Sequence, residues 1–225
     1  MEAQAGEQLA AMERNMARRG YLDGSEMATT FNMLRATDLI WSFVINNYLL
    51  GKEPFPFDLL YWNSDSTRMP AAMHSFYLRK CYHENVLVQP DGVSLAGVPI
   101  DLRRVDVPVY WVSTREDHIA PWKSTYAATQ LYRGPGKFVL AGSGHIAGVV
   151  NPPGTGKYGH WTNPELPADP EAWLAGATHH DGSWWTDWAE WNSGHAGEMV
   201  PARQPGAGKL KVIEDAPGSF VKVRA

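Results

Sequence analysis

The chain has 225 residues, of which 44% are hydrophobic and 20% charged, a balance typical of soluble globular domains rather than disordered, fibrous or repeat proteins. Its formal net charge of −4 at pH 7 gives no electrostatic reason to expect a nucleic-acid partner, because phosphate binding depends on clustered lysine and arginine. The first twenty residues are polar and charged, so we expect neither a secretory signal nor a membrane span. The single cysteine, Cys81, excludes an internal disulfide and fits a cytoplasmic protein.

Helical patterns dominate the amino-terminal part of the chain. Alanine, leucine and methionine recur at helical spacing from Glu7 to Arg19, and Gly20 follows as a terminating glycine. A second amphipathic helix is expected from Asp38 to Leu50. Residues 58–62 are predicted to form a short buried strand, and residues 71–87 a further helix.

Two apolar runs in the middle of the chain have the character of strands. The first covers Val107–Ser113, a helix is expected over Trp122–Leu131, and the second run covers Lys137–Ala141. A crossover of this length normally joins two parallel neighbouring strands, so the loops that hold Asp117 and His145 belong at the same edge of one sheet. The sequence therefore predicts an α/β fold in which these two side chains can meet.

An aspartate after one strand and a histidine after the next are in the order of the last two members of an α/β-hydrolase triad. The carboxylate accepts one ring N–H and fixes the tautomer, so that the other ring nitrogen can accept a proton from a nucleophile or an incoming hydroxyl. Asp117 and His145 are therefore the candidate catalytic residues. The alternative is a solvated loop aspartate and a histidine whose ring is satisfied by the backbone.

Tryptophan is unusually frequent in the carboxyl-terminal part. The chain has ten tryptophans, and six lie between Trp161 and Trp191. Short helices are expected over residues 170–176 and 184–192, and helical spacing of the tryptophans in the second favours packing over a contact surface for polymer or a partner. The chain after Pro201 is expected to be loosely ordered.

The sequence predicts no metal site and no cofactor. The adjacent His179 and His180 would point in different directions on a helix or strand, and no His-x-x-x-His pair with a nearby carboxylate occurs. His195 has no such partner either.

A nucleophile elbow is also missing. Neither Gly-x-Cys-x-Gly nor Gly-x-Ser-x-Gly occurs in the chain. Ser94 lies in Gly-Val-Ser-Leu-Ala-Gly, where the second glycine comes one position too late. Cys81 falls within a predicted helix and follows no strand, so we expect an ordinary packed thiol there.

Several segments resemble signature segments of class I polyhydroxyalkanoate synthases. They occur in the expected order along nearly the whole chain, and the similarity is weakest after Pro201. They are Tyr-Trp-Asn-Ser-Asp at 61–65, Arg-Glu-Asp-His-Ile-Ala-Pro-Trp at 115–122, Ser-Gly-His-Ile-Ala-Gly-Val-Val-Asn-Pro-Pro at 143–153, His-Trp-Thr-Asn at 160–163 and Gly-Ser-Trp-Trp at 182–185.

The resemblance implies the carboxyl-terminal part of an acyltransferase that polymerises (R)-3-hydroxyacyl-CoA into polyester with release of CoA. It matches Asp117 to the triad aspartate, His145 to the general base and His118 to a supporting histidine, while the family's cysteine nucleophile is absent. Trp62 and Asn63 would lie near the covered site without a catalytic role. Because losing a triad nucleophile costs on the order of 10⁶ in kcat, the lone chain is expected to be inactive.

The same resemblance implies an architecture and partners. Residues 1–90 would belong to a mainly helical cap or lid, residues 91–200 to the last parallel strands and helices of a partial α/β-hydrolase core, and residues 201–225 to a loosely ordered tail. A homodimer and the surface of polymer granules are the expected partners, with a CoA thioester as substrate and no cofactor. Two alternatives stay open: a noncatalytic module that pairs with full-length synthase or sits on granules, and another α/β-hydrolase such as an esterase.

Overall fold

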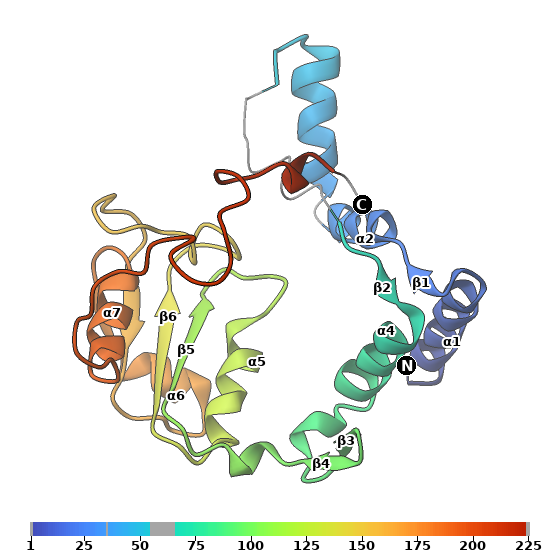
Figure 1. The fold of residues 1–225 in the computed structure, drawn as a ribbon. Coiled ribbons are helices and arrows are strands. Elements are labelled where there is room, and N and C mark those ends of the chain that lie inside the picture. Colours follow the sequence, from blue (N-terminus) through green and yellow to red (C-terminus); the bar gives the residue numbers. More distant parts are fainter. Residues whose placement is uncertain (1, 35, 55–65, 224–225) are drawn as a thin grey trace. The chain divides into compact units, whose positions relative to one another are not determined.

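The computed structural model describes residues 2–34, 36–54 and 66–223 (Figure 1). These residues combine helices and strands, so the predicted α/β class is confirmed. They group into two compact units, one from the described residues of Met1–Asn85 and Ala202–Ala225 and one from Val86–Pro201. None of the helices in the described ranges is both long and apolar enough to span a bilayer.

The first unit begins with the helix α1, which covers Glu2–Arg19 and confirms the first predicted helix. It ends at Gly20, whose φ of 83° is favourable for glycine. The carboxylate of Glu13 forms an ion pair with Arg79 at 2.8 Å and so ties α1 to a later helical segment of the same unit.

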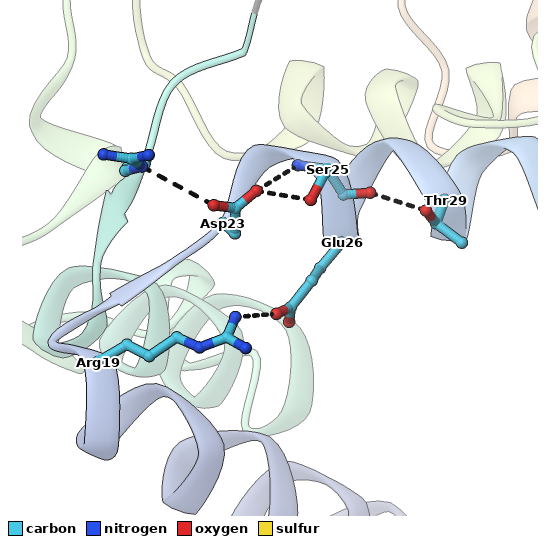
Figure 2. Close-up of polar contacts among 6 residues, drawn as sticks. Arg19, Asp23, Ser25, Glu26 and Thr29 are labelled. Carbon is cyan, nitrogen blue, oxygen red and sulfur yellow. Dashed lines mark hydrogen bonds and ion pairs between the residues drawn. The ribbon is translucent and has the colours of Figure 1, made fainter. Parts of the chain in front are cut away.

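The next helix, α2 (Gly24–Leu34), begins where the sequence analysis predicts none. Figure 2 shows how polar contacts define its first turn: Asp23 Oδ1 accepts hydrogen bonds from the Ser25 N–H at 3.0 Å and the Ser25 hydroxyl at 2.6 Å. Glu26 forms an ion pair with Arg19 at 2.6 Å in the same view. No side chain of α2 is buried, so these local contacts, rather than an apolar face, mark its start.

Helical backbone over Thr37–Leu49 confirms the helix predicted over 38–50. It contains two stretches of wide π-type turns, η1 (Thr37–Trp41) and η2 (Val44–Leu49). Two short strands, β1 (Tyr21–Leu22) and β2 (Met69–Pro70), pair in antiparallel fashion in this unit. The predicted strand at 58–62, with Trp62 and Asn63, lies outside the described residues.

The helix predicted over 71–87 is shorter than expected. It comprises α4 (Ala71–Tyr77) and the π-type turns of η3 (Leu78–His83). It ends before Asn85, whose φ of 50° is incompatible with a continuing helix. Cys81 therefore lies on helical backbone, as predicted, and its side chain is half-buried.

The second unit is built on a four-stranded sheet in the order β5-β6-β7-β8. The strands β5 (Val109–Thr114) and β6 (Gly136–Ala141) are parallel, as the two apolar runs predict. The strands β7 (His160–Thr162) and β8 (Thr178–His180) are antiparallel to their neighbours and were not predicted. Three residues are too few for a recognisable alternation of apolar and polar side chains, which explains the omission.

Helices predicted from the sequence cover one face of β5 and β6 with an aromatic core (Figure 1). The predicted helix after β5 forms as α5 (Trp122–Tyr126) and a 3-10 turn (Ala127–Gln130), and the predicted helix near residue 170 forms as α6 (Pro170–Ala175). Phe138 of β6 and Trp173 of α6 are completely buried, with ring centroids 5.0 Å apart. Burying one such ring stabilises the fold by roughly 1.5–3 kcal/mol.

The helix α7 (Trp185–Ser193) packs on the other face, because Tyr110 and Lys137 alternate with the core residues of their strands. Asp187 of α7 accepts a hydrogen bond from the Tyr110 hydroxyl at 2.7 Å and forms an ion pair with Lys137 at 2.6 Å. Burial and this carboxylate together raise the pKa of Tyr110, so the phenol stays protonated as a donor. One carboxylate thus fastens α7 to both parallel strands.

The tryptophans at α7 only partly confirm the predicted packing. Trp184, Trp185 and Trp191 are half-buried, and the Trp191 ring lies 5.2 Å from the ring of Tyr110. Trp188 is 43% exposed and faces solvent. After Pro201, residues 202–223 contain one short 3-10 helix, Phe220–Lys222, and nearly all their side chains are exposed.

The free edge of β5 generates a prediction about the isolated chain. Within the described residues β5 pairs with β6 on one side only, which leaves backbone N–H and C=O groups of its other side available to a second chain. We expect the purified chain to self-associate at micromolar concentration, as measured by sedimentation velocity. A 25.0 kDa monomer that melts cooperatively would contradict this expectation.

Candidate active site

The parallel register of β5 and β6 brings two loops to one edge of the sheet. Thr114, the last residue of β5, pairs with Ala141, the last residue of β6. The pairing continues beyond the strands, since the Arg115 N–H donates to Ala141 O at 2.8 Å and the Glu116 N–H donates to Ser143 O at 3.1 Å. The two loops therefore leave the sheet side by side.

Asp117 and His145, one on each loop, form the contact that the sequence predicts. Asp117 Oδ2 lies 2.7 Å from His145 Nδ1. An ionised carboxylate can only accept, so Nδ1 carries the proton, and in the neutral form of the ring Nε2 has the free lone pair. The Asp117 side chain is 8% exposed, whereas that of His145 is 45% exposed. The pair thus combines a buried carboxylate with a partly exposed imidazole ring.

The Asp117 carboxylate is oriented by its own turn. Its Oδ1 accepts hydrogen bonds from the backbone N–H groups of Ile119 at 2.8 Å and Ala120 at 2.9 Å, which leaves Oδ2 for His145. Burial on its own would raise the pKa of Asp117, but the two backbone N–H groups and the His145 ring outweigh it and hold the pKa below the ordinary 3.8. The carboxylate is therefore ionised at neutral pH.

The loop that holds His145 is tightly folded against the sheet. Ser143 adopts a φ of 72°, a left-handed conformation that is unfavourable for a residue other than glycine. The buried Gly148 donates its N–H to Gly144 O at 3.0 Å. A Cβ on Gly148 would lie 2.4 Å from Gly142 O and 2.6 Å from Thr114 Cγ2, so only glycine fits there without displacement.

His118, the predicted supporting histidine, is not joined to this pair. Its side chain is exposed, and no hydrogen bond links its ring to another described residue. A supporting role for His118 therefore remains a prediction that rests on the resemblance.

In the described residues, neither Cys81 nor Ser94 lies on the strained strand-to-helix turn that presents a nucleophile. Cys81 lies within the helical turns of η3. Ser94 lies in a β-hairpin formed by β3 (Val93–Leu95) and β4 (Val98–Ile100), which turns at residues of positive φ. A hairpin strand does not present a side chain as a nucleophile elbow does.

The described histidines and carboxylates do not form a metal site. No group of three or more potential ligands converges among them. His179 Nδ1 lies 3.7 Å from the fully exposed Asp181 carboxylate, while His160 and His180 stack with their ring centroids 5.1 Å apart. Burial lowers the pKa of His160, which keeps this stacked ring neutral.

The hydrogen bonds that hold Asp117 and the His145 loop in place are harder to predict from the sequence than Asp117 and His145 themselves. The hydrogen bonds from two backbone N–H groups to the Asp117 carboxylate have a local signal, because an aspartate at the start of a turn often accepts such bonds. The indole N–H groups of Trp184 and Trp185 donate to carbonyls of the His145 loop, more than thirty residues away, and nothing local in the sequence indicates this.

Comparison with known proteins finds relatives along nearly the whole chain. It is 53% identical over 218 residues to the poly(3-hydroxyalkanoate) polymerase subunit PhaC of Rhizobium etli, covering 97% of the chain and 34% of that protein. Identity to the corresponding subunit of Rhizobium meliloti is 54% (97% and 36% covered), and to that of Cupriavidus necator 50% (91% and 35% covered). The chain thus spans about a third of the length of these relatives. No protein-family model matches the chain.

The fit of Gly148 gives a test of the loop. Gly148→Ala should reduce the free energy of unfolding by about 1–3 kcal/mol, because the added Cβ must displace backbone. Gly144→Ala is the matched control, since the nearest atom to its Cβ, Glu116 O, would lie 3.9 Å away. Denaturant unfolding of the two variants measures the difference, and equal stability would contradict the predicted clash.

The lowered pKa of Asp117 predicts acid sensitivity. The stability contributed by its contacts should be complete above pH 3.8 and lost as pH falls through the lower folded pKa, because the unfolded carboxyl then binds more protons than the folded one. Asp117→Asn should remove this part of the pH dependence, as measured by denaturant unfolding across an acid series. Asp181→Asn, at a fully exposed carboxylate, should leave the profile unchanged.

Proposed function

Since this chain is a homologue of the carboxyl-terminal part of the poly(3-hydroxyalkanoate) polymerases, we propose that it supplies the aspartate and histidine of their acyl-transfer site. The observation that carries the proposal is the 2.7 Å contact between Asp117 Oδ2 and His145 Nδ1 at the carboxyl ends of two parallel strands. The proposed substrate class is an (R)-3-hydroxyacyl-CoA thioester, and the proposed product is a polyester with release of CoA.

In the proposed reaction His145 moves protons at Nε2. It takes the proton of a cysteine thiol, the thiolate attacks the thioester carbonyl, and the C–S bond to CoA breaks, so that CoA leaves with a proton returned by His145. It then takes the proton of the hydroxyl that attacks the acyl-enzyme, and the regenerated thiolate recovers it. Asp117 stabilises the imidazolium in each half of the cycle.

The nucleophile of this scheme is not provided by the described residues. Cys81 lies on helical backbone and Ser94 in a hairpin, so neither is presented as on an elbow. We therefore propose that the chain alone is inactive and that a cysteine on another segment completes the site.

Architecture and partners complete the proposal. We infer that residues 1–90 belong to a cap, residues 91–200 to the last part of an α/β-hydrolase core and residues 201–225 to a tail. The chain passes from one compact unit to the other after Asn85 and after Pro201, which supports the two boundaries of the core, although residues 202–225 group with the first unit. A homodimer, a place at polymer granules in the cytoplasm and the absence of a cofactor follow from the homology as proposals.

The decisive experiment supplies the missing segment. The portion of the Rhizobium etli polymerase that precedes the matched region is fused to this chain, and CoA release from (R)-3-hydroxybutyryl-CoA is measured as free thiol. We expect release by the fusion and none above buffer by the chain alone. In the fusion, His145→Ala should lower kcat by about 10⁶ and Asp117→Asn by about 10⁴.

His118→Ala in the fusion is the control, and it should cost far less than either change, because the His118 ring forms no hydrogen bond with Asp117 or His145. Release by the lone chain that vanishes in Cys81→Ser would overturn the proposal. A fusion that stays fully active without His145 would do the same. An inactive fusion that cosediments with granules would favour the noncatalytic module.

A further inference from the structure

Two indole N–H groups are directed at the loop that holds His145. Trp184 Nε1 donates to Gly148 O and to Val149 O, both at 3.2 Å. Trp185 Nε1 donates to Val149 O at 2.9 Å. These carbonyls lie three and four residues after His145, in the same tight loop.

The tryptophans are themselves held in place. The backbone N–H of Trp185 donates to the hydroxyl of the buried Ser183 at 3.0 Å, which fixes the start of α7. Asp187, two residues further on, joins α7 to Lys137 at 2.6 Å and to Tyr110 at 2.7 Å. The indoles are therefore anchored to the strands that carry the two loops of the candidate site.

The His145 ring needs this external support. Its side chain is 45% exposed, and its one hydrogen bond to a described residue is the bond to Asp117. The position of its backbone therefore decides whether Nδ1 reaches the carboxylate. Within the loop, the Val149 N–H and the Val150 N–H both donate to Ile146 O, at 3.1 and 2.8 Å, so a shift at Val149 is passed directly to the neighbour of His145.

We propose that Trp184 and Trp185 are positioning residues, whose indole N–H groups fasten the His145 loop to α7 and hold His145 Nδ1 within reach of Asp117. This inference rests on the proposed function, because positioning has a kinetic consequence only if His145 transfers protons. The indoles act through backbone carbonyls and do not contact the reacting atoms. Loss of a hydrogen bond to one carbonyl should displace the loop, and a small displacement of a general base is costly in rate.

The first test measures the loop in the isolated chain by hydrogen exchange and mass spectrometry, which tolerate self-association. Trp185→Phe keeps an aromatic ring and removes only the N–H donor. We expect the amides of Gly148, Val149 and Val150 to exchange about five- to tenfold faster in this variant, and faster still in the double variant with Trp184→Phe. Trp188→Phe is the matched control on the same helix, because Trp188 is exposed and its indole N–H donates no hydrogen bond to a described residue.

The second test measures kinetics in the fusion that completes the site. Trp185→Phe should lower kcat about tenfold with KM for the CoA thioester unchanged, because the base is misplaced while substrate contacts remain. A variant that merely weakened the fold would lower the melting temperature and the folded fraction instead. The kcat is therefore compared at temperatures where both proteins are fully folded by circular dichroism.

The outcomes separate cleanly. Unchanged exchange in the double variant, or equal acceleration in Trp188→Phe, would overturn the proposal. Faster exchange with an unchanged kcat would show a fastened loop that does not position the base, and would overturn it as well. A fusion with all its tryptophans that releases no CoA contradicts the proposed function instead, and exchange in the isolated chain still decides whether the indoles hold the loop.

Discussion

The strands β5 and β6 pair in parallel from Val109 opposite Gly136 to Thr114 opposite Ala141, and the candidate site depends on this register. Because both strands end at the same level, the loops after them start side by side and continue the pairing for two further hydrogen bonds. A slip of one residue would turn alternate side chains to the wrong faces and separate the loops. The contact between Asp117 and His145 depends on that register.

The two faces of the strands β5 and β6 are packed by different kinds of contact. Phe138 and Trp173, both completely buried, supply an apolar core that holds the strands against α5 and α6. On the opposite face, Asp187 joins α7 to the strands through polar contacts. The site above them is more open, with His145 nearly half exposed. Proton transfer to a separate reactant requires an accessible imidazole whose loop is supported by a well-packed sheet.

Prediction from the sequence succeeded where elements are long or patterned and failed where they are short. The apolar runs that became β5 and β6 and the helix that became α1 have enough residues to show a period. The three-residue strands β7 and β8 do not, and their pairing depends on the edge that β6 offers. The helix α2 was not predicted, although Met27, Phe31 and Leu34 recur in it at helical spacing, and none of its side chains is buried in the structure.

By itself, the sequence determined the α/β class, the order of Asp117 and His145 after successive strands, the lack of a nucleophile elbow and the resemblance to the synthases, since each of these is local or sequential information. Only the tertiary structure decided that Asp117 Oδ2 meets His145 Nδ1 and that Trp185 reaches the carbonyl of Val149. Such contacts join residues 28 and 36 positions apart, and they depend on how the elements pack in space. Local periodicity carries no information about those distances.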